Sequence, residues 1–454
     1  MEGTTGRQMD GLADFVFGLA PDAIPDAARD AAALMCLDTL GVIAAATPMQ
    51  AGVIARDTAC ALYGTADPSY RARLMFDGRI TGCAGAAFAA ATQADNLDAH
   101  DGFAPAKGHI GVAVIPALVA LAEQIPDLDG AEALALITIG YEVAGRAALS
   151  LHASVSDYHT SGAWNALGAA AVGARMRQLG PARLRHALGI AEYHGPRSQM
   201  MREIANPTML HDGSGWGVLA GLSALVLAEK GFEGAPAITV EDQAAAPFWA
   251  DLGQRWIMQR QFVKPYPVCR WAHAPIDGVR ELMAANTLRH DDIAAIRVRS
   301  FREAVCLFQG MPDTPSKAQY SMSFAIAVQA IHGRIGLEHI SGAGLSDPRV
   351  AAMIGRISVE ESDIHNATFP QGRDADVQMT LADGRVLETG TVHARGGPER
   401  PMPQADVIAK YHEFADGCLG AERAAAIRDA VLALAAPGAR FADVTRHLFA
   451  PPGG

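Results

Sequence analysis

Apolar residues recur at helical spacing through the first half of the chain. The segment 110–124 is apolar on nearly every side, which is typical of a helix buried in a core. The segments that we predict as helices are 24–46, 81–93, 110–124, 130–151, 162–179, 181–192 and 213–230. The pattern therefore predicts one helix after another from residue 8 to about residue 230.

The pattern changes after Pro265 and Pro267, two prolines in a short run that mark a break or a linker. One further helix is expected at 274–286. After it, the segment 293–301 alternates apolar and polar residues, as a half-buried strand does. Strands thus enter the pattern only in this later part of the chain.

A hairpin is predicted next, because two alternating runs, 377–381 and 385–389, flank Asp383-Gly384. The segment 396–404 is rich in Gly and Pro, and 405–449 is helical again. We therefore predict a mainly α fold. A large all-helical domain comprises 1–265 and 400–454, and a smaller α+β lid domain, 266–396, is inserted into it.

Composition narrows the function classes. Half of the 454 residues are hydrophobic, 19% are charged and the formal net charge is −12. A chain this acidic lacks the basic face that nucleic acids and anionic membranes require, so we expect neither as a partner. The N-terminal segment has no secretory pattern, and no uninterrupted apolar run reaches the roughly 18 residues of a membrane span. A cytoplasmic protein is expected.

The six cysteines are scattered and form no CxxC pair, so we expect free thiols and neither a zinc site nor another metal site. The chain also lacks the HExxH, GxSxG and Walker motifs. These absences argue against zinc proteases, α/β hydrolases and P-loop enzymes.

The densest polar cluster lies between two apolar helices. Its candidate residues are Asp98, His100, Asp101, Lys107 and His109. Histidine can take and give a proton near neutral pH, and a neighbouring carboxylate fixes its tautomer. The alternative is a solvated loop with an Asx-turn.

A second cluster places His159 directly before a helix of small residues, with Thr160 or Ser161 as its cap. A helix N-terminus favours negative charge, so this position suits a bound anion. The alternative is a plain capping loop. His152, His332 and His447 are interpreted as structural.

Two further segments offer ligands for carboxylates. The candidates there are Arg202, Thr208, His211, Lys264, Arg270 and His273. Arginine presents a two-pronged fork that matches a carboxylate. The glycines at 213, 215 and 217 are not interpreted as a dinucleotide loop, because no strand precedes them.

Four segments in this order resemble the MmgE/PrpD family. They are the Asp-rich loop before KGHIGVAVIPAL, then DYHTSGAWNALGAAA, then ALGIAEYHGPRSQMMREIANPTMLHDG, and finally KPYPVCRWAHAPID. The resemblance covers nearly the whole chain. It implies a helical domain, a lid domain, a homodimer and no required cofactor. It further implies that Asp98, His109 and His159 are catalytic and that His273 lies in the pocket.

Three positions depart from the family pattern. Gly102 stands where many members have Thr, Thr208 replaces a common Lys, and Phe324 replaces a Tyr. Lys107 could restore the lost charge from another side. These departures bear on which carboxylate is bound.

The leading hypothesis is a lyase that removes a proton next to a carboxylate of a small di- or tricarboxylate and expels water or another β-group. His109 and His159 would be base and acid, and Asp98 would orient one imidazole. One alternative is an isomerase or epimerase of a small dicarboxylate with two opposed bases. The other is a catalytically altered protein that binds carboxylates.

Overall fold

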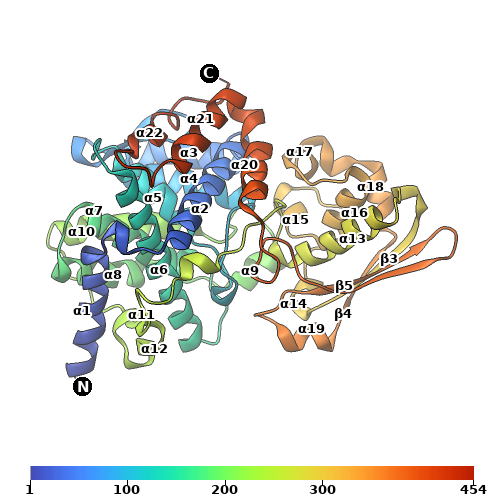
Figure 1. Cartoon of the computed structure of the whole chain (residues 1–454), viewed down its shortest axis with the longest axis horizontal. Coiled ribbons are helices and arrows are strands. Elements are labelled where there is room, and N and C mark those ends of the chain that lie inside the picture. The colour runs from blue at the N-terminus through green and yellow to red at the C-terminus, as the bar shows by residue number, and fades with distance from the viewer. Residues whose placement is uncertain (1, 454) are drawn as a thin grey trace.

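The computed structural model describes residues 2–453 and has two regions of different build (Figure 1). Helices with both chain termini form the larger region, and the strands β3 to β6 lie at the opposite end of the molecule. The helical domain contains α1 (Glu2–Gly18), α2 (Asp26–Ala45), α3 (Gln50–Leu62), α4 (Cys83–Leu97), α5 (Gly111–Ala122), α6 (Gly130–Ser154), α7 (Gly162–Met176), α8 (Pro181–His194), α9 (Met200–Ala205), α10 (Ser214–Glu229), α11 (Ile238–Glu241) and α12 (Ala246–Trp249). The prediction of a mainly helical fold is confirmed.

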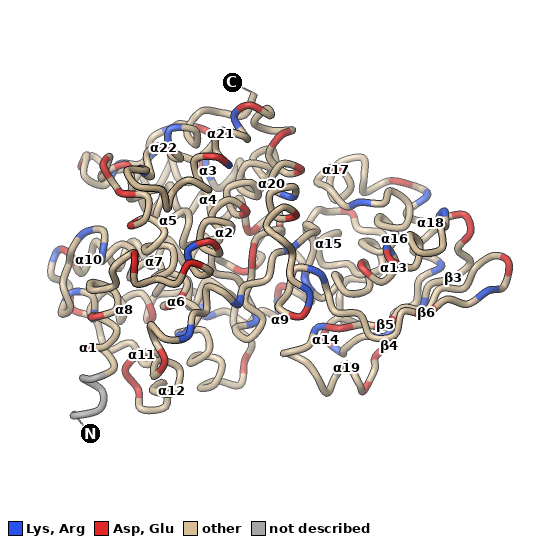
Figure 2. The backbone as a smooth tube through the Cα atoms, viewed as in Figure 1, with Lys and Arg blue, Asp and Glu red and all other residues tan. Residues whose placement is uncertain are grey.

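Helices α5 and α7 form the centre of this domain. Every residue of α5 is buried, and α7 packs against α6, α8 and α10. The α6–α7 contact is close: a Cβ on Gly168 would lie 2.9 Å from the carbonyl oxygen of Gly140. Helix α5 contains no charged residue, so its tube is tan in Figure 2.

One detail corrects the all-helical prediction. Strands β1 (Arg71–Arg73) and β2 (Ile80–Gly82) form a two-stranded antiparallel ribbon within the helical domain. Each has only three residues, too few for an alternating pattern to be visible in the sequence.

The lid domain contains a mixed sheet in the order β4-β3-β5-β6. Its elements are α13 (His273–Ala285), β3 (Ile293–Ser300), α14 (Arg302–Val305), α15 (Pro315–Gln319), α16 (Met322–His332), α17 (Leu337–Ile340), α18 (Pro348–Ile354), β4 (Ile357–Glu361), α19 (Asp363–Thr368), β5 (Ala375–Leu381) and β6 (Val386–Val392). The predicted strand and hairpin correspond to β3, β5 and β6. The parallel edge strand β4 was not predicted.

The C-terminal helices lie on the helical domain. They are α20 (Gln404–Leu419), α21 (Ala421–Leu432) and α22 (Ala442–Thr445). Helix α20 packs against α2, where the buried Lys410 donates to Asp38 over 2.6 Å. The same ammonium donates to the carbonyl oxygen of Ala99 over 2.6 Å. The tail thus supports the loop that carries the first polar cluster, while the exact domain boundaries stay a prediction.

Helix α6 is long and apolar enough to cross a membrane by length and composition alone. Its most apolar window is 94% buried inside the protein. Its hydropathy is therefore accounted for by its place in the core.

Candidate active site

His109 is the centre of a buried polar cluster. The chain leaves α4 through Asp98, whose φ of +54° is left-handed, and the loop then leads to His109 just before α5. The Nδ1 of His109 lies 2.5 Å from the carbonyl oxygen of Asp101. Because a carbonyl only accepts, Nδ1 carries the proton and Nε2 has the free lone pair. Burial, followed by the charge of Lys264, holds the pKa of His109 well below its usual range, so its imidazole is neutral at neutral pH.

Asp212 faces the free nitrogen of this imidazole. Its Oδ2 lies 3.8 Å from Nε2 of His109, and its Oδ1 accepts from the Ser161 hydroxyl over 2.8 Å. The same hydroxyl accepts the backbone N–H of His109 over 2.9 Å. Burial raises the pKa of Asp212 to about 6. Asp212 was not predicted, since it stands in a glycine-rich turn that was interpreted only as a helix start.

Asp98 is paired with a lysine rather than with an imidazole. The Lys264 ammonium donates to Oδ1 of Asp98 over 2.5 Å, across 166 residues of sequence, and both side chains are buried. Oδ2 of Asp98 is buried and has no hydrogen-bond partner among the described residues. The expectation that Asp98 orients a histidine is therefore wrong in this structure. Its close partner is Lys264, which was expected to bind a carboxylate of the substrate.

His100 lies behind His109. Their ring centroids are 4.4 Å apart, and Nε2 of His100 lies 3.3 Å from Oδ1 of Asp95. Oδ2 of Asp95 accepts the backbone N–H of Ser214 over 3.0 Å. Burial, reinforced by the charge of Asp212, raises the pKa of Asp95 well above its usual range. His100 is fully buried and contacts His109, so it supports the ring rather than presenting a surface to substrate.

Asp101 also points away from the cluster. A Cβ on Gly111 would lie 2.4 Å from its Oδ1 and 2.0 Å from the Tyr141 hydroxyl, so these groups gather at the start of α5. Burial, followed by the charge of Asp38, raises the pKa of Asp101 to about 7. Its backbone carbonyl serves His109, whereas its carboxyl group lies in the interior.

His159 lies beside His152. Its backbone N–H donates to Nε2 of His152 over 3.2 Å, and the two rings stack with centroids 6.4 Å apart. Nδ1 of His159 is buried without a hydrogen-bond partner among residues 2–453. In the described part of the chain, no hydrogen bond or ion pair joins His159 to His109 or Asp212. His152 is structural in the literal sense, because it holds the backbone of His159.

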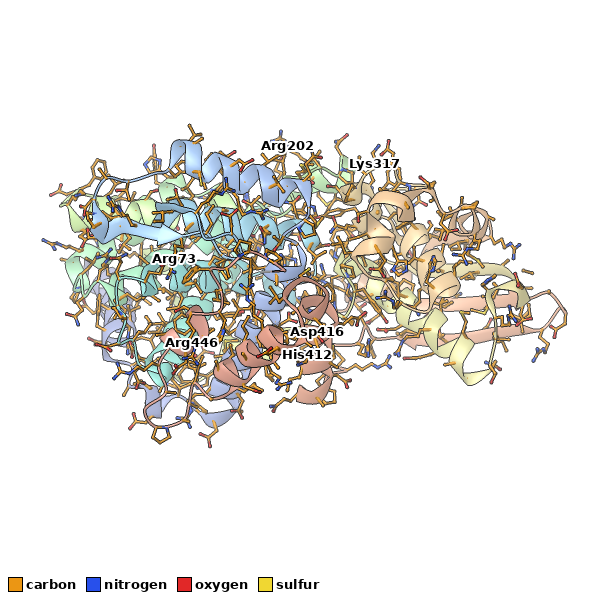
Figure 3. All side chains as sticks on the ribbon, turned by 90° about the horizontal axis from the view of Figure 1, so that it is seen from above. Arg73, Arg202, Lys317, His412, Asp416 and Arg446 are labelled. Carbon is orange, nitrogen blue, oxygen red and sulfur yellow. The ribbon has the colours of Figure 1, made fainter. Side chains whose placement is uncertain are left out.

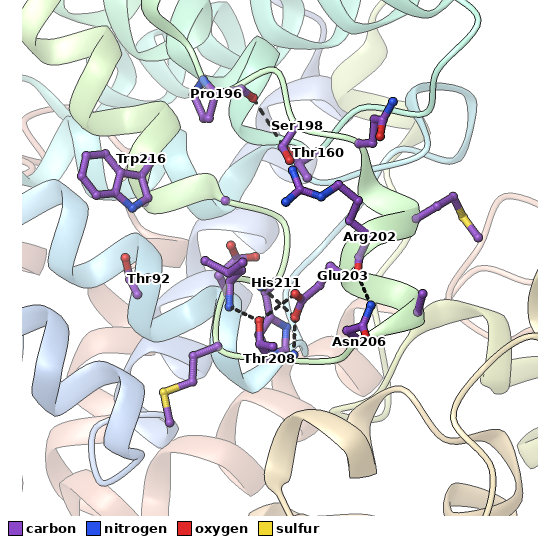
Figure 4. Close-up of a pocket in the computed structure, with 18 of the residues that line it drawn as sticks. Thr92, Thr160, Pro196, Ser198, Arg202, Glu203, Asn206, Thr208, His211 and Trp216 are labelled. Atoms are coloured by element: carbon purple, nitrogen blue, oxygen red, sulfur yellow. Dashed lines mark hydrogen bonds between the residues drawn. The ribbon is translucent and has the colours of Figure 1, made fainter.

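Arg202 and Thr208 line a second, outer pocket of about 710 Å³. Arg202 is exposed and lies at the edge of the molecule in Figure 3. Its guanidinium is directed toward Thr160 and Ser198 in Figure 4. The Thr208 hydroxyl donates to Glu203 over 2.7 Å, as the dashed lines show. Glu203 thus binds the side chain of Thr208, the residue that stands where the resemblance leads us to expect a lysine.

His211 forms part of the wall between this outer pocket and the cluster. It lines the pocket, is 1% exposed and has no hydrogen-bond partner on either ring nitrogen among the described residues. Burial lowers its pKa to about 3. Its ring centroid lies 5.5 Å from that of Tyr320, a buried lid residue that was not predicted.

Two more of the predicted ligands, Arg270 and His273, lie where the two domains meet. Arg270 is buried and donates to the carbonyl oxygens of Arg395 and Ala394 over 2.7 and 3.0 Å. His273 is fixed by Val268, whose carbonyl oxygen lies 3.0 Å from its Nε2.

Lys107 has a left-handed φ of +59° and its ammonium lies 5.7 Å from the Tyr158 ring centroid. Burial, followed by the charge of Arg373, lowers the pKa of Lys107. Arg373 is a lid residue that was not predicted. Lys107 therefore stands close enough to the lid to feel its charge.

Close packing around Gly102 explains one departure from the family pattern. A Cβ at this position would lie 2.4 Å from the Phe262 ring and 2.9 Å from Nδ1 of His109. A threonine here would force Phe262 to move. Phe324, the third departure, is completely buried, so its ring fills the core of the lid.

Among the described residues, no group of three His, Cys, Asp or Glu side chains is arranged to hold a metal ion. Activity without a metal or another cofactor stays a prediction.

Family models match most of the chain. The MmgE/PrpD N-terminal domain matches residues 10–249, and the MmgE/PrpD C-terminal domain matches residues 266–436. Cis-aconitate decarboxylase of Mus musculus is 24% identical over 366 residues, which cover 74% of this chain and 72% of that protein. Cis-aconitate decarboxylase of Aspergillus terreus (strain NIH 2624 / FGSC A1156) is 24% identical over 393 residues, which cover 78% and 77% of the two chains. The chain belongs to the MmgE/PrpD family, a family of lyases that act on small carboxylates.

Proposed function

We propose that this protein is a cofactor-independent lyase for a small di- or tricarboxylate. As a dehydratase, it removes the proton on the carbon next to a carboxylate and expels a β-hydroxyl group as water. As a decarboxylase, it releases carbon dioxide, and the carbon that keeps the electron pair takes up a proton. The observation that carries this proposal is the His109 arrangement, with Nδ1 on a backbone carbonyl and Nε2 free. A neutral, oriented imidazole is the group that general-base catalysis needs.

His109 would take the proton through Nε2. The imidazolium that forms would be stabilised by Asp212, whose Oδ2 lies 3.8 Å away. Ser161 keeps that carboxylate in place through its 2.8 Å hydrogen bond. Both groups are buried, so little water competes for the charge.

The leaving group needs an acid. Asp212, with its pKa near 6, is protonated in part of the population at neutral pH and can also give a proton. His159 remains the second proposed acid/base group, since its buried Nδ1 has no partner among the described residues. As part of the same proposal, the protein is a cytoplasmic homodimer whose partners are small carboxylates.

The test is a screen of di- and tricarboxylates, cis-aconitate included, in D2O and followed by proton NMR. The proposal expects an alkene product or carbon dioxide, with or without EDTA. Deuterium incorporation without elimination would favour the isomerase. Binding without either change would favour the carboxylate-binding protein. If chelation removes the activity and added metal restores it, the proposal that the lyase needs no cofactor is contradicted.

A further inference from the structure

A cavity of about 380 Å³ opens where the lid domain meets the loop of the first polar cluster. Its lining includes Ala104 and Phe262 from the helical side and Arg373 and His393 from the lid. Arg270 lines it as well. Asp374 and Glu399 also line it, and Asp374 is already bound to His393, whose Nδ1 lies 2.9 Å from its Oδ1.

Arg373 is the arginine in this cavity whose guanidinium has unused hydrogen-bond donors. Within residues 2–453 no ion pair joins it to a carboxylate, and its buried Nε has no hydrogen-bond partner. Its single protein contact of this kind is weak: Nη2 donates to the carbonyl oxygen of Ala104 over 3.3 Å. A guanidinium taken out of water without an anion is costly, and the cost is offset when an anion binds.

Arg270 differs from Arg373, because its Nη1 and Nη2 are already bound to the carbonyl oxygens of the lid segment that ends the sheet. Burial, followed by the charge of Arg373, lowers the pKa of Arg270, and the carboxylates of Asp277 and Glu399 oppose this shift. Arg270 therefore adds positive potential and fixes the wall, whereas Arg373 keeps its fork free for a ligand.

Phe262 connects the cavity to the catalytic group. The Arg373 guanidinium carbon lies 5.8 Å from the Phe262 ring centroid, and the Arg270 guanidinium carbon lies 4.7 Å from it. The same ring meets the His109 ring edge to face, with centroids 6.1 Å apart. A ligand on Arg373 is thus one aromatic ring away from the base.

We propose that Arg373 binds a second carboxylate of the substrate, in a subsite that is contributed by the lid domain and whose wall is formed by Arg270 and Phe262. This inference rests on the proposed function. It means that the preference for substrates with more than one carboxylate is set by the lid.

The subsite is tested with Arg373→Met and Arg373→Lys. Citrate and succinate serve as probes for binding by calorimetry, with acetate as the monocarboxylate comparison. Arg373→Met should weaken binding of citrate by about 10- to 100-fold, the range for a hydrogen-bonded charge pair. Arg373→Lys should recover part of the loss, because it keeps the charge and loses the fork. With the true substrate, KM should rise far more than kcat falls.

The matched control is Arg299→Met. Arg299 lies on β3, pairs with Asp376 over 3.1 Å, and has a side chain that is 52% exposed. The Arg299→Met variant should bind citrate as the wild type does. Melting temperatures should show that all variants are folded. If Arg373→Met binds citrate as tightly as the wild type, the subsite is overturned while the lyase stands. If the wild type binds and converts none of the di- and tricarboxylates, the lyase proposal fails and the subsite fails with it.

Discussion

The buried cluster around His109 and the outer pocket beneath Arg202 are neighbours with opposite character. The cluster gathers His109, Asp212 and Lys264 with exposures of 8%, 4% and 0%. The outer pocket has a volume of about 710 Å³, and its rim exposes 70% of Leu210 and 54% of Trp216. The open pocket and the buried cluster of ionisable side chains therefore lie in different places. Buried charged side chains are typical of a reacting centre, whereas a large exposed apolar rim is typical of a surface that contacts another protein chain.

The largest effect should come from the cluster. His109→Gln removes the free imidazole nitrogen and should lower turnover by roughly 10²- to 10⁴-fold. His159→Gln should also lower turnover, by less, because in the described structure no hydrogen bond or ion pair joins His159 to Asp212. Turnover and melting temperature would be measured for both.

His290→Gln is the control for these two variants, since His290 pairs with the exposed Asp291 at the surface. Near-native turnover of His109→Gln would refute the assignment of the base. A loss in His159→Gln as large as in His109→Gln would show that the two histidines act as one unit.

Substitutions in the exposed apolar rim of the outer pocket should change the assembly of the protein. We expect a dimer by light scattering at micromolar concentration, with the apolar rim at the interface. Leu210→Asp should shift the protein toward the monomer. Ile364→Asp is a matched control, because Ile364 is also 70% exposed but lies on the lid helix α19. A dimer that survives Leu210→Asp and dissociates with Ile364→Asp would place the interface on the lid.

The third prediction concerns the side of the cluster that faces the interior, where the carboxyl group of Asp101 makes stability depend on pH. Burial raises the pKa of Asp101 to about 7, so the stability that this shift contributes is present at low pH and is lost as pH rises through about 7. Asp101→Asn keeps the group neutral. Its melting temperature should therefore gain on that of the wild type between pH 5.5 and 8.5.

The comparison variant for this test is Asp291→Asn, whose side chain is 73% exposed. Its difference from the wild type should stay nearly constant over the same pH range. A constant difference for Asp101→Asn as well would show that its carboxyl group does not titrate in this window.

The smallest effect is expected from Thr208→Lys. A lysine there would restore the common family charge and should shift preference toward substrates with one more carboxylate. Glu203 already binds Thr208 through its backbone and hydroxyl, at 2.6 and 2.7 Å, and would neutralise much of the new charge. We therefore expect a change of kcat/KM below about tenfold, as for an exposed ion pair. A larger shift would mean that Glu203 turns away from the new ammonium.

Periodicity predicted the long elements well, because their burial is one-sided or complete. Helix α5 was expected at 110–124 and spans Gly111–Ala122, and strand β3 was expected at 293–301 and spans Ile293–Ser300. Strand β4 was missed because, at the sheet edge, none of its residues is fully buried. Its sequence, ISVEE, therefore carries no clean alternation.

The site was predictable in its residue types and much less in its pairings. A loop with two histidines and two aspartates indicated an acid/base site. The Asp98–Lys264 pair could not be predicted in the same way, because it joins residues 166 positions apart. Asp212 was hidden in a turn whose glycines drew the interpretation toward backbone geometry. Arg373 stands alone in a lid loop, and only the fold brings it to the cavity beside Phe262.

The contact between Lys410 and Asp38 sets an order of events during synthesis. The two residues are 372 positions apart, so at typical elongation rates of 5–20 residues per second Asp38 waits roughly 20–75 s for its cation. Until then Ala99 also lacks the ammonium that holds its carbonyl in the loop before His109. A nascent chain can thus bury its helices long before it acquires a working centre. The loop before His109 therefore gains its full set of contacts only when α20 has been made and has docked.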